Sequence, residues 1–195
     1  MKKLFCVELP FILTILALFL SCSSTTTIAV DKESGQIVKT SIDLANAYVE
    51  RGQYQKALDV YTVACENVED YRLIYNLSLV YAYMKDYNAA YSTALHGFKT
   101  FEDKKLFLNA MSVYAEHLED SEKVSYTYVN LLELDSENIS YRKKYCNALI
   151  ELGFEKEAYE NAMMLWNAKC YDGETVEILY KINPAEWETV YKIFH

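Results

Sequence analysis

The sequence predicts an all-α fold, a solenoid built from antiparallel helix pairs, and two observations lead to this prediction. Small side chains recur at intervals of 33, 34 and 34 positions, at Ala57, Ala90, Val124 and Ala158. Each of them stands in a similar local sequence, with apolar residues at helical spacing before and after it. A period of this length indicates a row of similar helix pairs, which stack because no single pair can bury its apolar face alone.

Each predicted unit contains two helices. In the first unit, Leu44, Ala45 and Tyr48 lie on one stripe of the first helix, and Gly52 separates this helix from the second. Paired helices approach closely only where the facing side chains are small. The small residues of the first helices are Ala45, Ser78, Ser112 and Cys146. We therefore expect them to face the small residues of the second helices. The alignment gives four units, at residues 38–70, 71–103, 105–138 and 139–172.

The turn between the two helices of a unit differs along the chain. Gly52 and Gly153 can adopt the left-handed backbone conformation that ends a helix abruptly. The corresponding turns at Lys85-Asp86 and Glu119-Asp120 contain no glycine. We therefore expect the first helix of these two units to end less sharply.

This pattern resembles the tetratricopeptide repeat (TPR) family over residues 38–172. The resemblance implies a right-handed solenoid whose first helices line a concave groove. The proline common near the end of each repeat in that family is absent from all four units, and a related helical array is the alternative. The matching residues of the first unit are Leu44, Ala45, Tyr48, Gly52, Tyr54, Ala57, Tyr61 and Ala64.

The period fails after Asp172, and residues 173–195 are expected to form capping helices. Asn183 and Pro184 have the character of a helix start. One face of the helix that follows carries Trp187, Val190, Tyr191 and Phe194. This face either covers the open end of the solenoid or docks a partner or a second copy of the chain.

The amino-terminal residues resemble a bacterial lipoprotein signal peptide, residues 1–21, followed by Cys22 as the lipid-modified residue. The apolar run of residues 11–20 would span about 15 Å as a helix, half of the roughly 30 Å of a hydrocarbon core, which argues against an uncleaved anchor. Phe19 and Glu8 depart from the usual signal. Residues 22–36 are rich in Ser and Thr and are expected to form a flexible tether. These features predict a lipid-anchored envelope protein that faces the periplasm, with the outer membrane favoured.

Composition and motifs limit the function. The net charge of −9 opposes binding to nucleic acid, because association with phosphates would add repulsion. We find no phosphate-binding loop, no nucleophile motif and no metal-ligand spacing, and therefore expect no enzyme activity, no cofactor and no metal site. Cys146 is expected to be a buried thiol, and Cys65 and Cys170 are too far apart along the array for a disulfide.

The resemblance places the binding site on the groove formed by the first helices. Asparagine amides and exposed aromatics suit a bound protein segment. A clamp for a C-terminal carboxylate is rejected, because Ile42, Leu106 and Ala110 stand where cations are needed. The expected groove residues are Asn46, Tyr75, Asn76, Leu79, Tyr83, Asn109, Val113, Lys143 and Asn147.

Three functions fit these observations. The first is an adaptor that binds a protein partner through the groove in an envelope assembly. The second is an accessory subunit of an envelope transport system that presents or channels a small ligand. The third is a structural oligomer held together by the face from Trp187 to Phe194. The sequence leaves the partner and the oligomeric state open.

Overall fold

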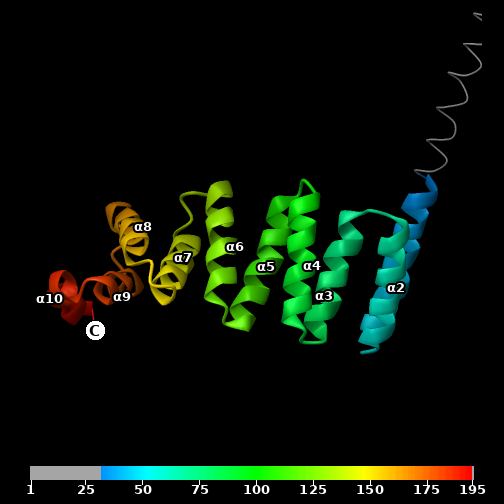
Figure 1. The fold of residues 1–195 in the computed structure, drawn as a ribbon, viewed down its shortest axis with the longest axis horizontal. Coiled ribbons are helices and arrows are strands. Elements are labelled where there is room, and N and C mark those ends of the chain that lie inside the picture. Colours follow the sequence, from blue (N-terminus) through cyan, green and yellow to red (C-terminus); the bar gives the residue numbers. More distant parts are fainter. Residues whose placement is uncertain (1–31, 195) are drawn as a thin grey trace, which may run out of the picture. The chain divides into compact units, whose positions relative to one another are not determined.

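The computed structural model describes residues 32–194, which form α-helices joined by short connections and contain no strand in that range (Figure 1). The first helix covers residues 32–49. It is followed by α2 Tyr54–Asn67, α3 Tyr71–Tyr83, α4 Tyr87–Thr100, α5 Lys104–Leu118, α6 Ser121–Leu134, α7 Ile139–Glu151, α8 Glu155–Asn167, α9 Gly173–Ile182 and α10 Pro184–Phe194. The prediction of an all-α chain of consecutive helices is confirmed.

The chain divides into two compact units, and the boundary lies inside α3, between Leu73 and Ile74. In the first unit, Ala45 and Ala57 are both fully buried, as the small-residue pattern requires. The hydroxyl of buried Tyr61 donates to Oδ1 of Asn46 at 3.2 Å. The prediction for Leu44 is wrong, because this side chain is 46% exposed instead of packed.

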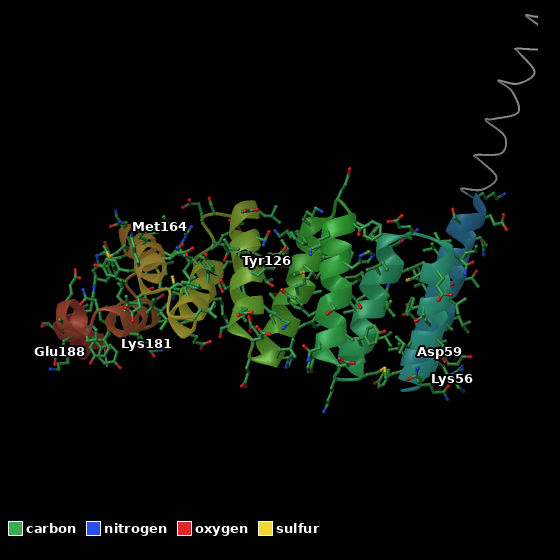
Figure 2. The ribbon with its side chains drawn as sticks, in the orientation of Figure 1. Lys56, Asp59, Tyr126, Met164, Lys181 and Glu188 are labelled. Carbon is green, nitrogen blue, oxygen red and sulfur yellow. The ribbon has the colours of Figure 1, made fainter. Side chains whose placement is uncertain are left out.

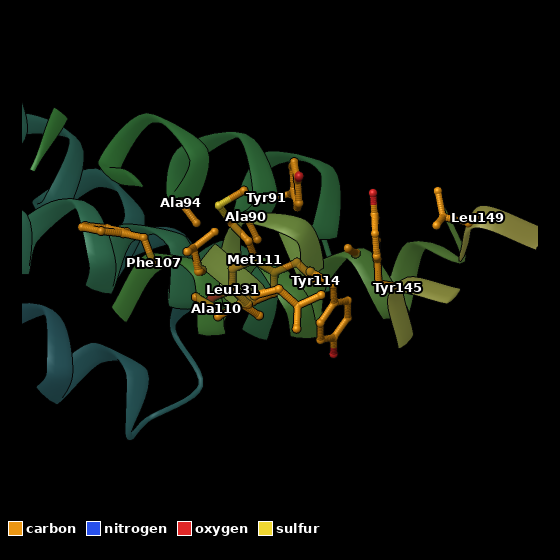
Figure 3. Packing of buried hydrophobic residues seen from close by; sticks show 14 of the residues in the cluster. Ala90, Tyr91, Ala94, Phe107, Ala110, Met111, Tyr114, Leu131, Tyr145 and Leu149 are labelled. Atoms are coloured by element: carbon orange, nitrogen blue, oxygen red, sulfur yellow. The ribbon is translucent and has the colours of Figure 1, made fainter. Parts of the chain in front are cut away.

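In the second unit each helix from α4 to α10 packs against the next one, and α7 also contacts α9 (Figure 1). Small residues again lie where the helices approach, since Ser78, Ala90, Cys146 and Ala158 are fully buried. Phe107 and Met111 of α5 pack in one hydrophobic cluster with Ala90 (Figure 3). In the third of the predicted units the corresponding residues, Ser112 and Val124, are only partly buried.

The turns without glycine are as sharp as those with glycine, which corrects the expectation from sequence. Gly52 and Gly153 have φ angles of 68° and 78°, and Lys85 and Glu119 adopt similar values of 63° and 52°. All four residues follow the same period as the small residues. The repeat geometry therefore imposes a left-handed residue at this position whether or not it is glycine.

The helices after Asp172 pack as a further pair, in which α10 lies against α9 and α9 lies against α8. Trp187 is buried beside Trp166, with ring centroids 4.8 Å apart. Tyr191 stacks on Tyr180, with centroids 4.1 Å apart. The aromatic face of α10 thus packs mainly inward, as a cap would, and only Phe194 at its end is substantially exposed.

At the amino terminus, residues 32–36 are helical and so do not belong to the expected tether. The predicted signal peptide and Cys22 lie outside the described residues. None of the helices within residues 32–194 is long and apolar enough to cross a membrane.

Candidate functional site

The candidate site lies on the surface formed by the first helices of successive pairs in the second unit. These helices are α5, α7 and α9, together with residues 74–83 of α3, and we call this surface the first-helix face. Tyr83 and Val113 are expected groove residues and are 54% and 52% exposed. Asn109 is also exposed, whereas Leu79 and Asn76 are partly buried. Most of the expected positions on α3 and α5 are thus accessible to a partner.

Side-chain contacts join the part of α3 in the second unit to α5. The Tyr75 ring meets Phe107 edge to face, with centroids 6.3 Å apart. The Ser78 hydroxyl donates to the Tyr75 carbonyl at 2.6 Å and lies 3.3 Å from the Tyr114 hydroxyl. Burial raises the pKa of Tyr114, which keeps this phenol neutral. Tyr83 and Val113 therefore project from a packed support.

Asn46 belongs to the first unit and is considered there alone. Its side chain is exposed, as expected for a groove residue. Its amide oxygen accepts the hydrogen bond from Tyr61, which leaves the amide nitrogen to bind other groups.

Lys143 is not a groove residue, and the expectation from sequence is corrected. The side chain is buried, and its ammonium lies 2.5 Å from Asp172 and 3.1 Å from Glu174. Burial alone would lower the pKa of Lys143, but the two carboxylates raise it overall. Lys143 therefore ties α7 to the start of α9 and is not available to a ligand.

A cavity of about 710 Å³ opens on the first-helix face where α5, α7 and α9 meet, with the start of α6 at its edge. Asn147, one of the expected groove residues, lies in its wall. An apolar part of the wall comes from Val124, Ala148 and Ile178. The remaining wall is charged or polar and comprises Glu116, Glu119, Ser121, Lys144, Glu151, Glu174, Glu177 and Lys181.

The charges around the cavity are unbalanced, with five glutamates and two lysines in the wall. Both lysines are already paired. Lys144 lies 3.2 Å from Glu116, and Lys181 lies 2.8 Å from Glu177. Burial would raise the pKa of Glu116, but hydrogen bonds from Tyr128 and Lys144 lower it overall, so this carboxylate stays ionised.

Two carboxylates of the wall have no cationic partner within residues 32–194. Glu151 accepts a hydrogen bond from the Ser121 hydroxyl, and Glu119 stands at the left-handed turn after α5. The sequence pattern predicted no cavity at these glutamates. One feature of the sequence could have indicated that these glutamates lie near each other. Glu116 and Glu151 both fall in the last turns of first helices.

The opposite side of the helix pairs offers a different surface. Tyr126 of α6 and Met164 of α8 are 41% and 53% exposed (Figure 2). They lie on second helices, away from the first-helix face, and serve as positions for comparison in the experiments below.

The described residues hold no group of three or more His, Cys, Asp or Glu side chains placed to bind a metal ion. Cys65, Cys146 and Cys170 are free thiols. Burial raises the pKa of Cys146 to about 12, so this thiol is protonated at neutral pH.

No family model matches the chain, and no curated protein matches it either. Solved structures do. MamA from Desulfovibrio magneticus RS-1 superposes with a TM-score of 0.57 at 11% identity, over 80% of this chain and 88% of that one. A MamA from AMB-1 gives 0.57 at 12% identity, over 80% and 85% of the two chains. YrrB, described as a TPR protein with an unusual peptide-binding site, gives 0.52 at 15% identity, over 78% and 90%. These likenesses show that the chain has a TPR-like solenoid fold.

Proposed function

We propose that this protein binds a segment of a partner protein along the first-helix face of its second unit. The observation that supports this proposal is the combination of half-exposed Tyr83 and Val113 on packed helices with a cavity on the same face. Side chains on packed helices lose little conformational freedom when a partner covers them, and tyrosine is enriched among the residues that dominate binding energies at protein interfaces. The peptide-binding site named for YrrB is consistent with this role.

A protein segment fits the surface better than a small ligand of a transport system. The cavity volume lies in the range of small-molecule pockets. Such pockets, however, are lined mostly by apolar and aromatic side chains, and here most of the wall is charged. The exposed side chains of Tyr83 and Val113 lie outside the cavity, on α3 and α5, and only an extended ligand reaches both these side chains and the cavity.

We further propose that the protein acts in a bacterial envelope, held to the membrane by lipid on Cys22. The support is the basic and apolar start of the sequence followed by Ser21-Cys22. Labelled palmitate should be incorporated into the wild-type chain, which should sediment with membranes. Cys22→Ser should lose both properties. Membrane association that persists without label in Cys22→Ser would contradict lipid anchoring.

Site-specific photocrosslinking tests the binding surface. A photoreactive amino acid replaces Val113 on the first-helix face or, as the matched control, Tyr126 on α6. We expect Val113 to give one discrete crosslinked protein in living cells and Tyr126 to give none. Tyr83→Ala should reduce the Val113 product severalfold without changing the thermal stability, because this side chain is half exposed. Equal products from Val113 and Tyr126, or no effect of Tyr83→Ala, would reject the first-helix face.

A further inference from the structure

We infer that the cavity between α5, α7 and α9 receives lysine or arginine side chains of the bound segment. The inference rests on the proposed function and specifies the chemistry of the partner at one part of that surface. Its basis is the charge that the cavity leaves uncompensated, together with the shape of its wall.

The cavity has more negative charge than its own lysines neutralise. Lys144 and Lys181 are each held by a glutamate of the wall, and Lys143 behind the wall is held by Asp172 and Glu174. Glu119 and Glu151 remain without a cationic partner in the described part of the chain. A cation that enters the cavity gains attraction from these two carboxylates without having to displace an existing ion pair.

The wall also matches the shape of a long basic side chain. Val124, Ala148 and Ile178 provide apolar surface for methylene groups, and the glutamates surround it. Lysine and arginine combine an apolar stem with a charged end, and they bury the stem where the end can keep polar partners. The Asn147 amide in the same wall can accept a hydrogen bond from either cation.

Two other occupants fit less well. A metal ion needs several ligands converging within bonding distance, and no such group exists among residues 32–194. A second copy of this chain carries the same net charge of −9, so its approach to an acidic cavity is opposed by repulsion. A basic segment of a different protein is the occupant that the charges favour.

Peptide selection tests this inference. A phage library of short random peptides is selected against the full chain and, in parallel, against Glu119→Gln/Glu151→Gln. The control variant is Glu102→Gln/Glu133→Gln, which removes the same charge at exposed positions outside the cavity. We expect peptides enriched in lysine and arginine for the wild type and the control, and no such enrichment for the cavity variant.

A selected peptide is then synthesised and its dissociation constant is measured. Acetylation of its lysines or replacement of its arginines by citrulline should weaken binding about tenfold, as should Glu119→Gln/Glu151→Gln. The affinity for the wild type should also fall as salt is added. The control variant should bind like the wild type.

The outcomes separate this inference from the proposed function. Selected peptides that lack basic residues but lose affinity with Tyr83→Ala would overturn the inference and leave the proposed function intact. Peptides whose binding depends on neither Tyr83 nor the two glutamates would overturn both. The selection could also enrich no peptide, while spermidine binds the protein in a way that depends on Glu119 and Glu151. This result would assign the cavity to a small cation and overturn the inference.

Discussion

Gly97 of α4 lies directly against the ring of Phe107 in α5. A Cβ atom added at Gly97 would lie less than 3.0 Å from three carbon atoms of this ring. The ring has little room to move, because Phe107 is fully buried and packs against Tyr75 and Phe101. Gly97 is therefore required for close helix contact, although glycine costs about 1 kcal/mol relative to alanine in an ordinary helix.

Gly97→Ala should lower the free energy of unfolding by about 1–3 kcal/mol, because overpacking against Phe107 outweighs the gain in helix propensity. Chemical denaturation measures this change. Gly35→Ala is the matched control, since nothing lies near the added methyl group there, and it should be neutral or stabilising. Phe107→Leu should reduce the cost of Gly97→Ala in the double variant. A Gly97→Ala protein as stable as Gly35→Ala would contradict the packing described here.

The left-handed residues Lys85 and Glu119 predict a second set of changes. A non-glycine residue in this conformation costs about 1–2 kcal/mol, and glycine relieves the cost while adding some freedom to the unfolded chain. We expect Lys85→Gly and Glu119→Gly each to raise the free energy of unfolding by about 0.5–1 kcal/mol. Lys39→Gly, on an exposed helical site, should instead lower it by about 1 kcal/mol. Destabilisation by all three substitutions would argue against left-handed turns.

The same four turns differ in the residue that begins the next helix. After Lys85 and Glu119, the side chains of Asp86 and Asp120 accept hydrogen bonds from backbone N–H groups of α4 and α6. After the glycines, Gln53 and Phe154 make no such bond. The turns with the less favourable backbone thus carry the better helix caps.

Exchanging the caps should change stability in opposite directions. Asp86→Ala should lower the free energy of unfolding by about 0.5–2 kcal/mol, because the Ala89 N–H loses its acceptor. Gln53→Asp should raise it by about 1 kcal/mol, by supplying an acceptor that α2 lacks. Thermal unfolding followed by circular dichroism compares the two variants. An unchanged melting temperature for Asp86→Ala would show that the cap contributes nothing.

The helix pairs could be predicted from sequence because their contacts repeat. Ala57, Ala90 and Ala158 are fully buried at the predicted interval, since the close approach of paired helices recurs in each unit. Leu44 was predicted to be buried and is exposed, because a helical stripe gives the direction of a side chain but not the extent of the neighbour that would cover it. The left-handed backbone at Lys85 was not predicted for a related reason. The packing of the helix pair imposes a positive φ there, although lysine by itself disfavours this conformation.

The candidate binding surface was only partly predictable. Tyr83, Val113 and Asn109 are exposed as their positions in the unit imply. The burial of Lys143 depends on Asp172 and Glu174, about 30 residues further along the chain, which stand at the end of the last predicted unit and just beyond it. Because the periodicity ends at Asp172, no register could be predicted for α9. For the same reason, the glutamates of the cavity could not be assigned to one wall.

The ion pairs of Lys143 predict how stability depends on pH. Burial would raise the pKa of Asp172, but hydrogen bonds from Lys143 and Thr175 lower it overall, well below 3.8. A carboxylate whose pKa is lowered by folding stabilises the fold at pH values above the pKa of the unfolded chain. This contribution is lost as the pH falls from that value toward the pKa of the folded state. The pKa of Lys143 is raised above 10.5, so its contribution is complete below pH 10.5 and is lost as the pH rises through the folded value.

Lys143→Met should therefore lower the free energy of unfolding by about 1 kcal/mol at pH 7, since the carboxylate partners are half exposed and partly screened. The difference from the wild type should shrink below pH 3.8, where Asp172 becomes protonated on unfolding. Urea denaturation at a series of pH values measures it. Lys156→Met, which removes an exposed lysine of α8 4.0 Å from Glu160, should match the wild type throughout. A Lys143→Met deficit that stays constant from pH 7 to strong acid would mean that lost packing of the lysine stem, and not its ion pairs, causes the destabilisation.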